Sequence, residues 1–99
     1  MMVHWTEVAS SDLESIRRYI ARDKPVASNL WIDRLIKRAH AAAESPWLGR
    51  VVPEFRLNNV REVFLRSYRI IYRVVDEGIL VLSVSHGRRP LRGVNPYAE

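Results

Sequence analysis

The sequence has no cysteine among its 99 residues. Disulfide bridges, thiolate metal sites and cysteine nucleophiles are therefore excluded, and this composition fits the reducing cytoplasm. No run of about 18 apolar residues is present, although a membrane-spanning helix needs one. The N-terminal segment MMVHWTEVASS also lacks the basic head and apolar run of a secretion signal. We expect a cytoplasmic protein that makes no contact with a membrane.

Glycine and proline are scarce, at 4 and 5 residues, while hydrophobic residues make up 47% of the chain. A disordered or fibrous chain would contain more of the first two and fewer of the third. The length is that of one hydrophobic core without an internal hinge. The sequence therefore predicts a single domain over residues 1–99.

Positive charge is in excess, with 16 Lys and Arg against 11 Asp and Glu, and the printed sequence shows that 14 of the 16 are arginine. The planar guanidinium group binds carboxylates and phosphates through two parallel hydrogen bonds. This composition favours an anionic partner, either nucleic acid or an acidic protein segment, over an apolar small molecule.

The N-terminal half predicts one strand followed by two helices. The segment MMVHWT is β-branched and aromatic, and its last residue, Thr6, suits the N-cap of a helix. Apolar residues then recur every three or four positions from Glu7 to about Arg22. A second amphipathic pattern begins with Pro25 in a first turn and ends near Glu44, before a proline that stops helices.

The C-terminal half predicts an antiparallel meander of three strands, over residues 61–66, 68–75 and 79–86. Residues 51–60 predict an irregular link or a short edge strand, and the tail from Gly87 onward predicts surface coil. The order is β-α-α-β-β-β, an α+β fold in which a two-helix hairpin packs on an antiparallel sheet.

The hairpin between the last two strands brings together an arginine and a histidine. Strand alternation places Arg69 and Arg73 on one face. If Glu77 and Gly78 form a two-residue loop, Arg69 lies opposite His86, and a four-residue loop preserves this register. A three-residue loop with Gly78 in the left-handed conformation places Arg69 opposite Ser85 instead.

An adjacent arginine and histidine suit the attack of a ribose 2′-hydroxyl group on phosphate. The imidazole of His86 would move a proton near neutral pH, and the guanidinium of Arg69 would offset charge on the phosphoryl oxygens. Glu54 would complete the set as a base. In the alternative interpretation, His86 ends a strand with a backbone hydrogen bond and Arg69 pairs with Glu62 on the neighbouring strand.

Further arginines are candidates for a patch that binds a phosphate backbone or the acidic side of a protein partner. They are Arg61, Arg73, Arg88, Arg89 and Arg92. We expect these groups to gather on one side of the sheet, where the helices leave room for an anionic partner. The alternative is a basic tail that is merely solvated.

The tryptophans and two of the histidines give weaker signals. Trp5, Trp31 and Trp47 predict buried anchors of a small core, with stacking platforms as the alternative. His4 and His40 do not form a ligand spacing with any Asp or Glu. The sequence therefore predicts neither a metal site nor a cofactor.

Four segments together resemble the RelE/ParE superfamily of toxins from bacterial toxin–antitoxin and plasmid-stabilisation systems. They are VHWTEVASSDLESIRRYI, SPWLGRVVPE, VREVFLRSYRIIYRV and VLSVSHGRR. The resemblance implies a strand, a helix pair and a strand meander, an antitoxin that wraps and neutralises the toxin, and growth arrest when the antitoxin is lost. In RelE-like ribosome-dependent mRNA endonucleases, the active site includes the arginine that Arg69 matches and basic or histidine side chains after the last strand, where His86 and Arg88 fall. One subgroup adds a glutamate like Glu54.

The sequence departs from RelE on the strand before Arg69, where Glu62 and Phe64 replace lysines. The Arg61-Glu62 pair and the VSHGRR segment look more like ParE members, which poison DNA gyrase. The resemblance therefore favours a ParE-like gyrase toxin that binds through the five arginines above. A RelE-like endonuclease acting on the ribosome and its mRNA, and a non-toxic basic interaction module, are the alternatives.

Overall fold

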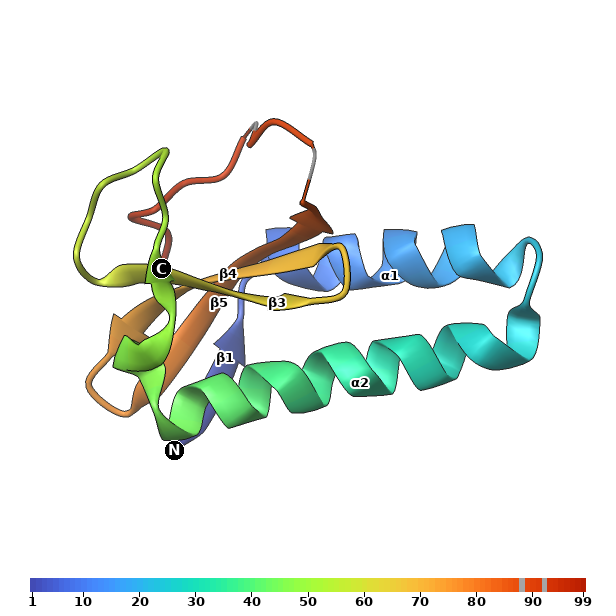
Figure 1. The fold of residues 1–99 in the computed structure, drawn as a ribbon, viewed down its shortest axis with the longest axis horizontal. Coiled ribbons are helices and arrows are strands. Elements are labelled where there is room, and N and C mark those ends of the chain that lie inside the picture. The colour runs from blue at the N-terminus through green and yellow to red at the C-terminus, as the bar shows by residue number, and fades with distance from the viewer. Residues whose placement is uncertain (88, 92) are drawn as a thin grey trace.

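The computed structural model describes residues 1–87, 89–91 and 93–99. Its elements follow the predicted order of a strand, two helices and a strand meander (Figure 1). They are β1 (Met2–Trp5), α1 (Glu7–Ala21), α2 (Pro25–Glu44), the 3₁₀ helix η1 (Pro46–Leu48), β2 (Arg50–Val51), β3 (Val60–Leu65), β4 (Tyr68–Val75) and β5 (Gly78–His86). None of the helices in the described ranges is long and apolar enough to cross a membrane.

The helix boundaries follow from a side-chain cap in α1 and from the position of proline in α2. The hydroxyl oxygen of Thr6 accepts a 3.1 Å hydrogen bond from the amide of Ala9 and caps α1, as predicted. The same hydroxyl donates to the carbonyl oxygen of Leu82 at 3.1 Å, so the cap also joins α1 to β5. Pro25 occupies the first turn of α2, which ends at Glu44 as predicted.

The sheet has the strand order β1-β5-β4-β3-β2. The meander of β3, β4 and β5 is antiparallel, as predicted, and β2 adds an antiparallel edge of two residues. β1 pairs with β5 in the parallel direction, so the sheet is mixed. The predicted fold class is confirmed, with the parallel β1 as the feature that the prediction of an antiparallel sheet did not contain.

The register of the last hairpin differs from the expected two-residue loop of Glu77 and Gly78. Val75 pairs with Gly78, so the loop consists of Asp76 and Glu77. A bulge at the step from Ile71 to Tyr72 then shifts the register. As a result Arg69 lies opposite Ser85 and Tyr68 lies opposite His86. The predicted pairing of Arg69 with His86 is wrong.

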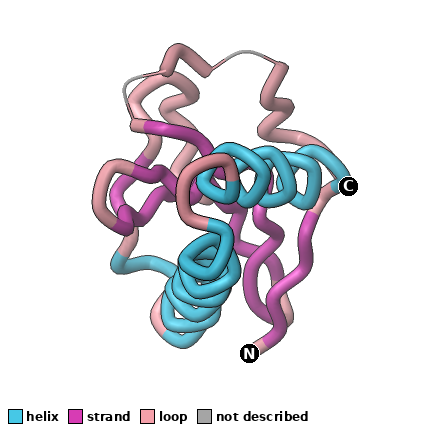
Figure 2. The backbone as a smooth tube through the Cα atoms, turned by 90° about the vertical axis from the view of Figure 1, so that its right-hand side faces the viewer, coloured by secondary structure: helices cyan, strands magenta, loops and turns pink. Residues whose placement is uncertain are grey.

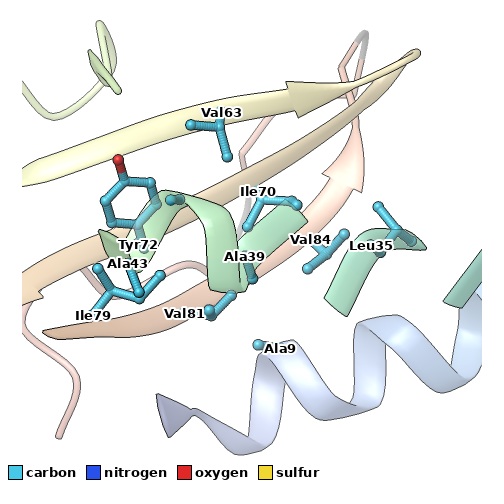
Figure 3. Packing of buried hydrophobic residues seen from close by; sticks show 11 residues of the cluster. Ala9, Leu35, Ala39, Ala43, Val63, Ile70, Tyr72, Ile79, Val81 and Val84 are labelled. Atoms are coloured by element: carbon cyan, nitrogen blue, oxygen red, sulfur yellow. The ribbon is translucent and has the colours of Figure 1, made fainter. Parts of the chain in front are cut away.

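Two apolar clusters cover the two faces of the sheet. The first lies between the helices and the sheet (Figure 3) and includes the fully buried residues Leu35, Ile70 and Tyr72. The hydroxyl of Tyr72 donates to the carbonyl oxygen of Pro46 at 2.6 Å, which fixes η1 to the sheet. Tyr68, Ile70, Tyr72 and Val74 all join this cluster, which confirms the predicted alternation of β4.

The second cluster lies on the opposite face of the sheet and was not predicted. It contains Val52, Val60, Ile71, Leu80 and Leu82, with Leu91, Val94 and Ala98 of the C-terminal tail packed against it. In Figures 1 and 2 the tail and the loop of residues 52–59 lie at the top, away from α2. The tail is coil, as expected, and it also covers part of the core.

The three tryptophans have different environments. Trp5 is partly buried against the first cluster, and the ring of Trp31 lies 6.3 Å from that of Tyr68. Trp47 is 52% exposed, so its prediction as a buried anchor is wrong. It lies in η1, a short segment at the end of α2 rather than inside either cluster.

Candidate functional site

Arg69 lies in the middle of a network of charged side chains on the face of the sheet that points away from the helices. Only 5% of the residue is exposed. Its Nε donates to Oε1 of Glu62 at 2.8 Å, and Nη2 is 2.5 Å from the same oxygen. Nη1 and Nη2 also donate to the two carboxylate oxygens of Glu54, at 2.8 and 3.0 Å. All three nitrogens of the guanidinium group are therefore bound by carboxylates.

Strand geometry explains why Glu62 reaches Arg69. Arg69 lies opposite Phe64 in the ladder of β3 and β4, and Glu62 is two residues from Phe64, on the same face. The Glu62 side chain is fully buried. Its Oε2 accepts a 2.6 Å hydrogen bond from Nε of Arg50 on β2. Two guanidinium and two carboxylate groups thus compensate one another in charge.

The sequence left open the alternative that Arg69 pairs with Glu62 on the neighbouring strand. The hydrogen bond between these two residues confirms this alternative. Glu54 is also brought to Arg69, as an ion-pair partner from the loop after β2. The hydrogen bond from Arg69 is the main cause that lowers the pKa of Glu54. The hydrogen bonds to Glu54 and Glu62 raise the pKa of Arg69 against the opposing effect of burial.

The lowered pKa of Glu54 predicts a pH dependence of stability. A carboxyl group whose pKa is below its ordinary value of 4.5 in the folded state stabilises the fold above that pH. This stabilisation is lost as the pH falls through the lowered pKa. Because the Glu54 side chain is 42% exposed, we expect Glu54→Gln to lower the free energy of unfolding by about 1 kcal/mol at pH 7.

Urea unfolding at several pH values measures this effect. The difference between Glu54→Gln and the parent protein should shrink in strong acid, where Glu54 is protonated in both states. Glu44→Gln is the matched control, because Glu44 has an exposed side chain and is not in the network. A Glu54→Gln difference that stays constant from neutral pH to strong acid would contradict the role of the carboxylate charge.

His86 lies on the other face of the sheet from Arg69. It pairs with Tyr68, and their rings meet edge to face with centroids 6.0 Å apart. Tyr68 packs against the cluster beneath the helices, and burial raises its pKa. His86 lines a cavity of about 210 Å³ with Tyr19 of α1 and with Arg89. The expected set of Arg69, His86 and Glu54 is therefore not assembled around one point.

The arginines predicted to bind a target are not gathered on one side. Arg61 pairs with Tyr72 on the helix side of the sheet, whereas Arg73 pairs with Leu80 on the opposite side. Arg61 donates to the backbone carbonyl oxygens of Asn58, Trp47 and Gly49, at distances from 2.7 to 3.0 Å. These bonds hold η1 and the loop after β2 against β3.

Arg73 has a comparable structural contact, because its Nη1 donates to the carbonyl oxygen of Pro96 at 2.9 Å and holds the C-terminal tail. Arg89 is exposed and lines the cavity beside His86. Arg88 and Arg92, the two remaining candidates, lie outside the described residues. The expected patch on a single side of the sheet is therefore wrong, while the roles of these residues in binding a target stay predictions.

Comparison with known proteins assigns the chain to a family. Residues 3–91 match the family model described as the ParE toxin of the type II toxin–antitoxin system parDE. The chain belongs to this family of toxins. Among curated relatives of this ParE-family toxin, Toxin RelE2 of Caulobacter vibrioides is 34% identical over 88 residues, which cover 88% of this chain and 96% of the relative. Toxin RelE3 of the same bacterium is 28% identical over 82 residues, which cover 79% and 85%.

Two solved structures share the fold of this ParE-family toxin. The chromosomal ParDE toxin–antitoxin system from P. aeruginosa matches with a TM-score of 0.73 and 19% identity, over 87% of this chain and 95% of that one. The RelBE2 toxin–antitoxin complex from Mycobacterium tuberculosis matches with a TM-score of 0.61 and 21% identity, over 86% and 95%. The relatives carry both ParE and RelE names, so the ParE/RelE superfamily is shown.

Sequence reasoning missed two partners that position the site of this ParE-family toxin. Arg50 was not among the predicted site residues, although it begins β2 and binds the buried Glu62. The carbonyl oxygen of Pro96 holds Arg73, and no side-chain pattern indicates a backbone acceptor. A signal for Arg50 did exist, because a glutamate predicted inside an otherwise apolar strand requires a cationic partner.

Proposed function

We propose that this protein is the toxin of a type II module, that a cognate antitoxin neutralises it, and that it arrests growth by binding DNA gyrase rather than by cutting RNA. The observation that carries the choice of target is the network around Arg69. An endonuclease of the predicted kind needs this guanidinium group free for a phosphoryl oxygen. Here its three nitrogens are bound by Glu54 and Glu62.

The position of His86 supports the same choice. A general base and a phosphate-binding arginine must reach the same phosphodiester group within hydrogen-bond distance. His86 faces the helix side of the sheet beside Tyr68, and Arg69 faces the other side. A toxin that acts by occupying a surface of its target has no such requirement. We therefore assign target binding to the exposed Arg89 and, from the sequence alone, to Arg88 and Arg92.

The proposed antitoxin follows from the family and from charge. Both solved relatives were determined as toxin–antitoxin systems. The net charge of +5 favours a partner segment that is acidic or amphipathic.

The endonuclease is the second candidate, because two curated relatives carry the RelE name and because Glu54 and Arg69 are in contact. In this case the ribosome would have to separate Arg69 from its carboxylates. A non-toxic interaction module is the third candidate. Harmless overproduction of the chain without its antitoxin would support it over both toxins.

A supercoiling assay with a folded double variant tests the choice. Arg69→Met with Glu62→Leu replaces a buried ion pair with apolar groups, which is often neutral for stability or stabilising. We expect the parent protein to inhibit supercoiling by purified gyrase and to accumulate cleaved DNA. The double variant should retain at least about half of this activity, because the replaced groups do not face the target.

Message integrity on translating ribosomes is measured in parallel, and we expect it to be unchanged. Thermal unfolding confirms that the double variant is folded. If gyrase is unaffected and the parent cuts mRNA at codon-dependent positions that the folded double variant leaves intact, the endonuclease replaces the gyrase toxin as the function.

A further inference from the structure

Arginine–aromatic pairs lie on α2, η1, β2 and β3, the elements around one edge of the sheet. They are Arg34 with Trp31 at 5.5 Å, Arg50 with Phe64 at 5.7 Å and Arg61 with Trp47 at 5.1 Å, measured from guanidinium carbon to ring centre. Such pairs occur about once per 70–80 residues in proteins. Three occur in this 99-residue chain, on elements around the edge of β3. We name these residues, with Arg38, the edge band.

The edge band follows an open part of the sheet. β2 pairs with β3 only at Arg61 and Glu62, so among the described residues the outer side of β3 from Val63 to Leu65 has no strand partner. Arg38 of α2 donates to the carbonyl oxygen of Phe64 at 3.3 Å. Figure 1 shows α2 running alongside β3 at this edge. A charged side chain thus blocks pairing with another strand and places a cation there instead.

The charges of the edge band are mostly uncompensated. Arg50 is paired with Glu62. Within the described part of the chain, no carboxylate lies at ion-pair distance from Arg34, Arg38 or Arg61. The three nitrogens of Arg61 already donate to oxygens of Asn58, Trp47 and Gly49, so Arg34 and Arg38 are the candidates for direct binding of an anion. Phe64 is 42% exposed and Trp47 is 52% exposed. Positive charge and accessible aromatic rings therefore occur together in the edge band.

We propose that the edge band binds single-stranded nucleic acid. The guanidinium groups of Arg34 and Arg38 would bind phosphate oxygens. Bases stack on exposed aromatic rings whatever their sequence. An acidic peptide would compensate the same charges and would leave the rings without a stacking partner, so nucleic acid is favoured. The edge band shares no residue with the predicted contacts to gyrase except Arg61, and it is independent of which target the toxin has.

Fluorescence polarisation with a labelled 12-nucleotide single strand tests the proposal, without gyrase or ribosomes. Arg34→Ala with Arg38→Ala is expected to weaken binding about tenfold or more in low salt. The slope of log affinity against log salt should become shallower by about 1.4, as two lost phosphate contacts predict. Trp47→Ala is expected to weaken binding about fivefold or more, and Trp47→Phe should largely restore it.

The matched control is Arg17→Ala with Arg18→Ala on α1, which changes the net charge equally but removes arginines already paired with Glu14. It should weaken binding less than about twofold, and thermal unfolding of every variant verifies folding. Equal losses in the two double variants would reduce the effect to net charge and overturn the proposal. Tighter binding of a labelled polyglutamate peptide, with the same dependence on Arg34 and Arg38, would assign the edge band to an acidic protein instead.

Discussion

Replacement of Glu62 by alanine is expected to lower the free energy of unfolding by about 3–5 kcal/mol. Glu62 is 1% exposed and Arg69 is 5% exposed. Removing the carboxylate leaves the Arg69 guanidinium in the protein interior, where the partly exposed Glu54 is its one remaining anionic partner among the described side chains. Burying a charge without adequate compensation is among the largest penalties that a point mutation produces.

Urea unfolding and the thermal midpoint both measure this loss. For a domain of this size, about 1 kcal/mol corresponds to a shift of roughly 4–8 °C in the midpoint. Arg50→Ala is the matched control, because Arg50 also binds Glu62 but its side chain is 63% exposed. It should cost less than about 1 kcal/mol. A comparable loss in Glu62→Ala and Arg50→Ala would show that Glu62 is held by its exposed partner and not by the buried one.

The Glu62 result bears on how inactive variants of this toxin are interpreted. Arg69→Ala would leave the fully buried Glu62 carboxylate without its interior partner, and a similar loss of stability follows. Loss of growth arrest in Arg69→Ala is therefore expected whether Arg69 is catalytic or structural. The double replacement by apolar residues avoids this ambiguity because it removes both charges together.

Local patterns predicted the helices and strands closely. α2 and β4 have the expected boundaries, and the ends of α1, β3 and β5 differ by one residue. Caps, proline positions and periodic apolar residues are local signals, and they act over the same distances as the structures that they specify. The parallel pairing of β1 with β5 depends on residues 76 positions apart, so no local pattern contained it.

The candidate site was less predictable because it depends on register and on backbone acceptors. The loop of Asp76 and Glu77 moves the pairing of Arg69 from His86 to Val84, and the bulge between Ile71 and Tyr72 then moves it by one position to Ser85. We expected Gly78 to be a residue of the loop because glycine is common in turns. In the structure Gly78 is the first residue of β5 and pairs with Val75. The contact of Arg69 with Glu62 could be predicted because both residues lie on strands that neighbour each other in the sequence.

The observed register of the hairpin places glycine at position 78, where the backbone of Met2 comes close. The replacement of Gly78 by alanine is the second mutation for which we expect a large effect. Gly78 has a φ of 153°, and a Cβ atom added to it would lie 2.0 Å from the carbonyl oxygen and 2.7 Å from the amide nitrogen of Met2. Both atoms are backbone, so the clash cannot be relieved by rotating a side chain. Gly78→Ala should lower the free energy of unfolding by about 2–5 kcal/mol, from backbone strain and from displacement of β1.

Gly93→Ala separates the two causes, because Gly93 has a φ of 70° but a Cβ atom there would meet no atom within 4 Å. It should cost about 1–2 kcal/mol from strain alone. Hydrogen exchange of the amides from Met2 to Thr6 should accelerate in Gly78→Ala and not in Gly93→Ala, because β1 pairs along Gly78 to Val81. Equal losses of stability with unchanged protection of these amides would mean that β1 accommodates the methyl group. The close approach of Met2 would then not be what requires glycine at this position.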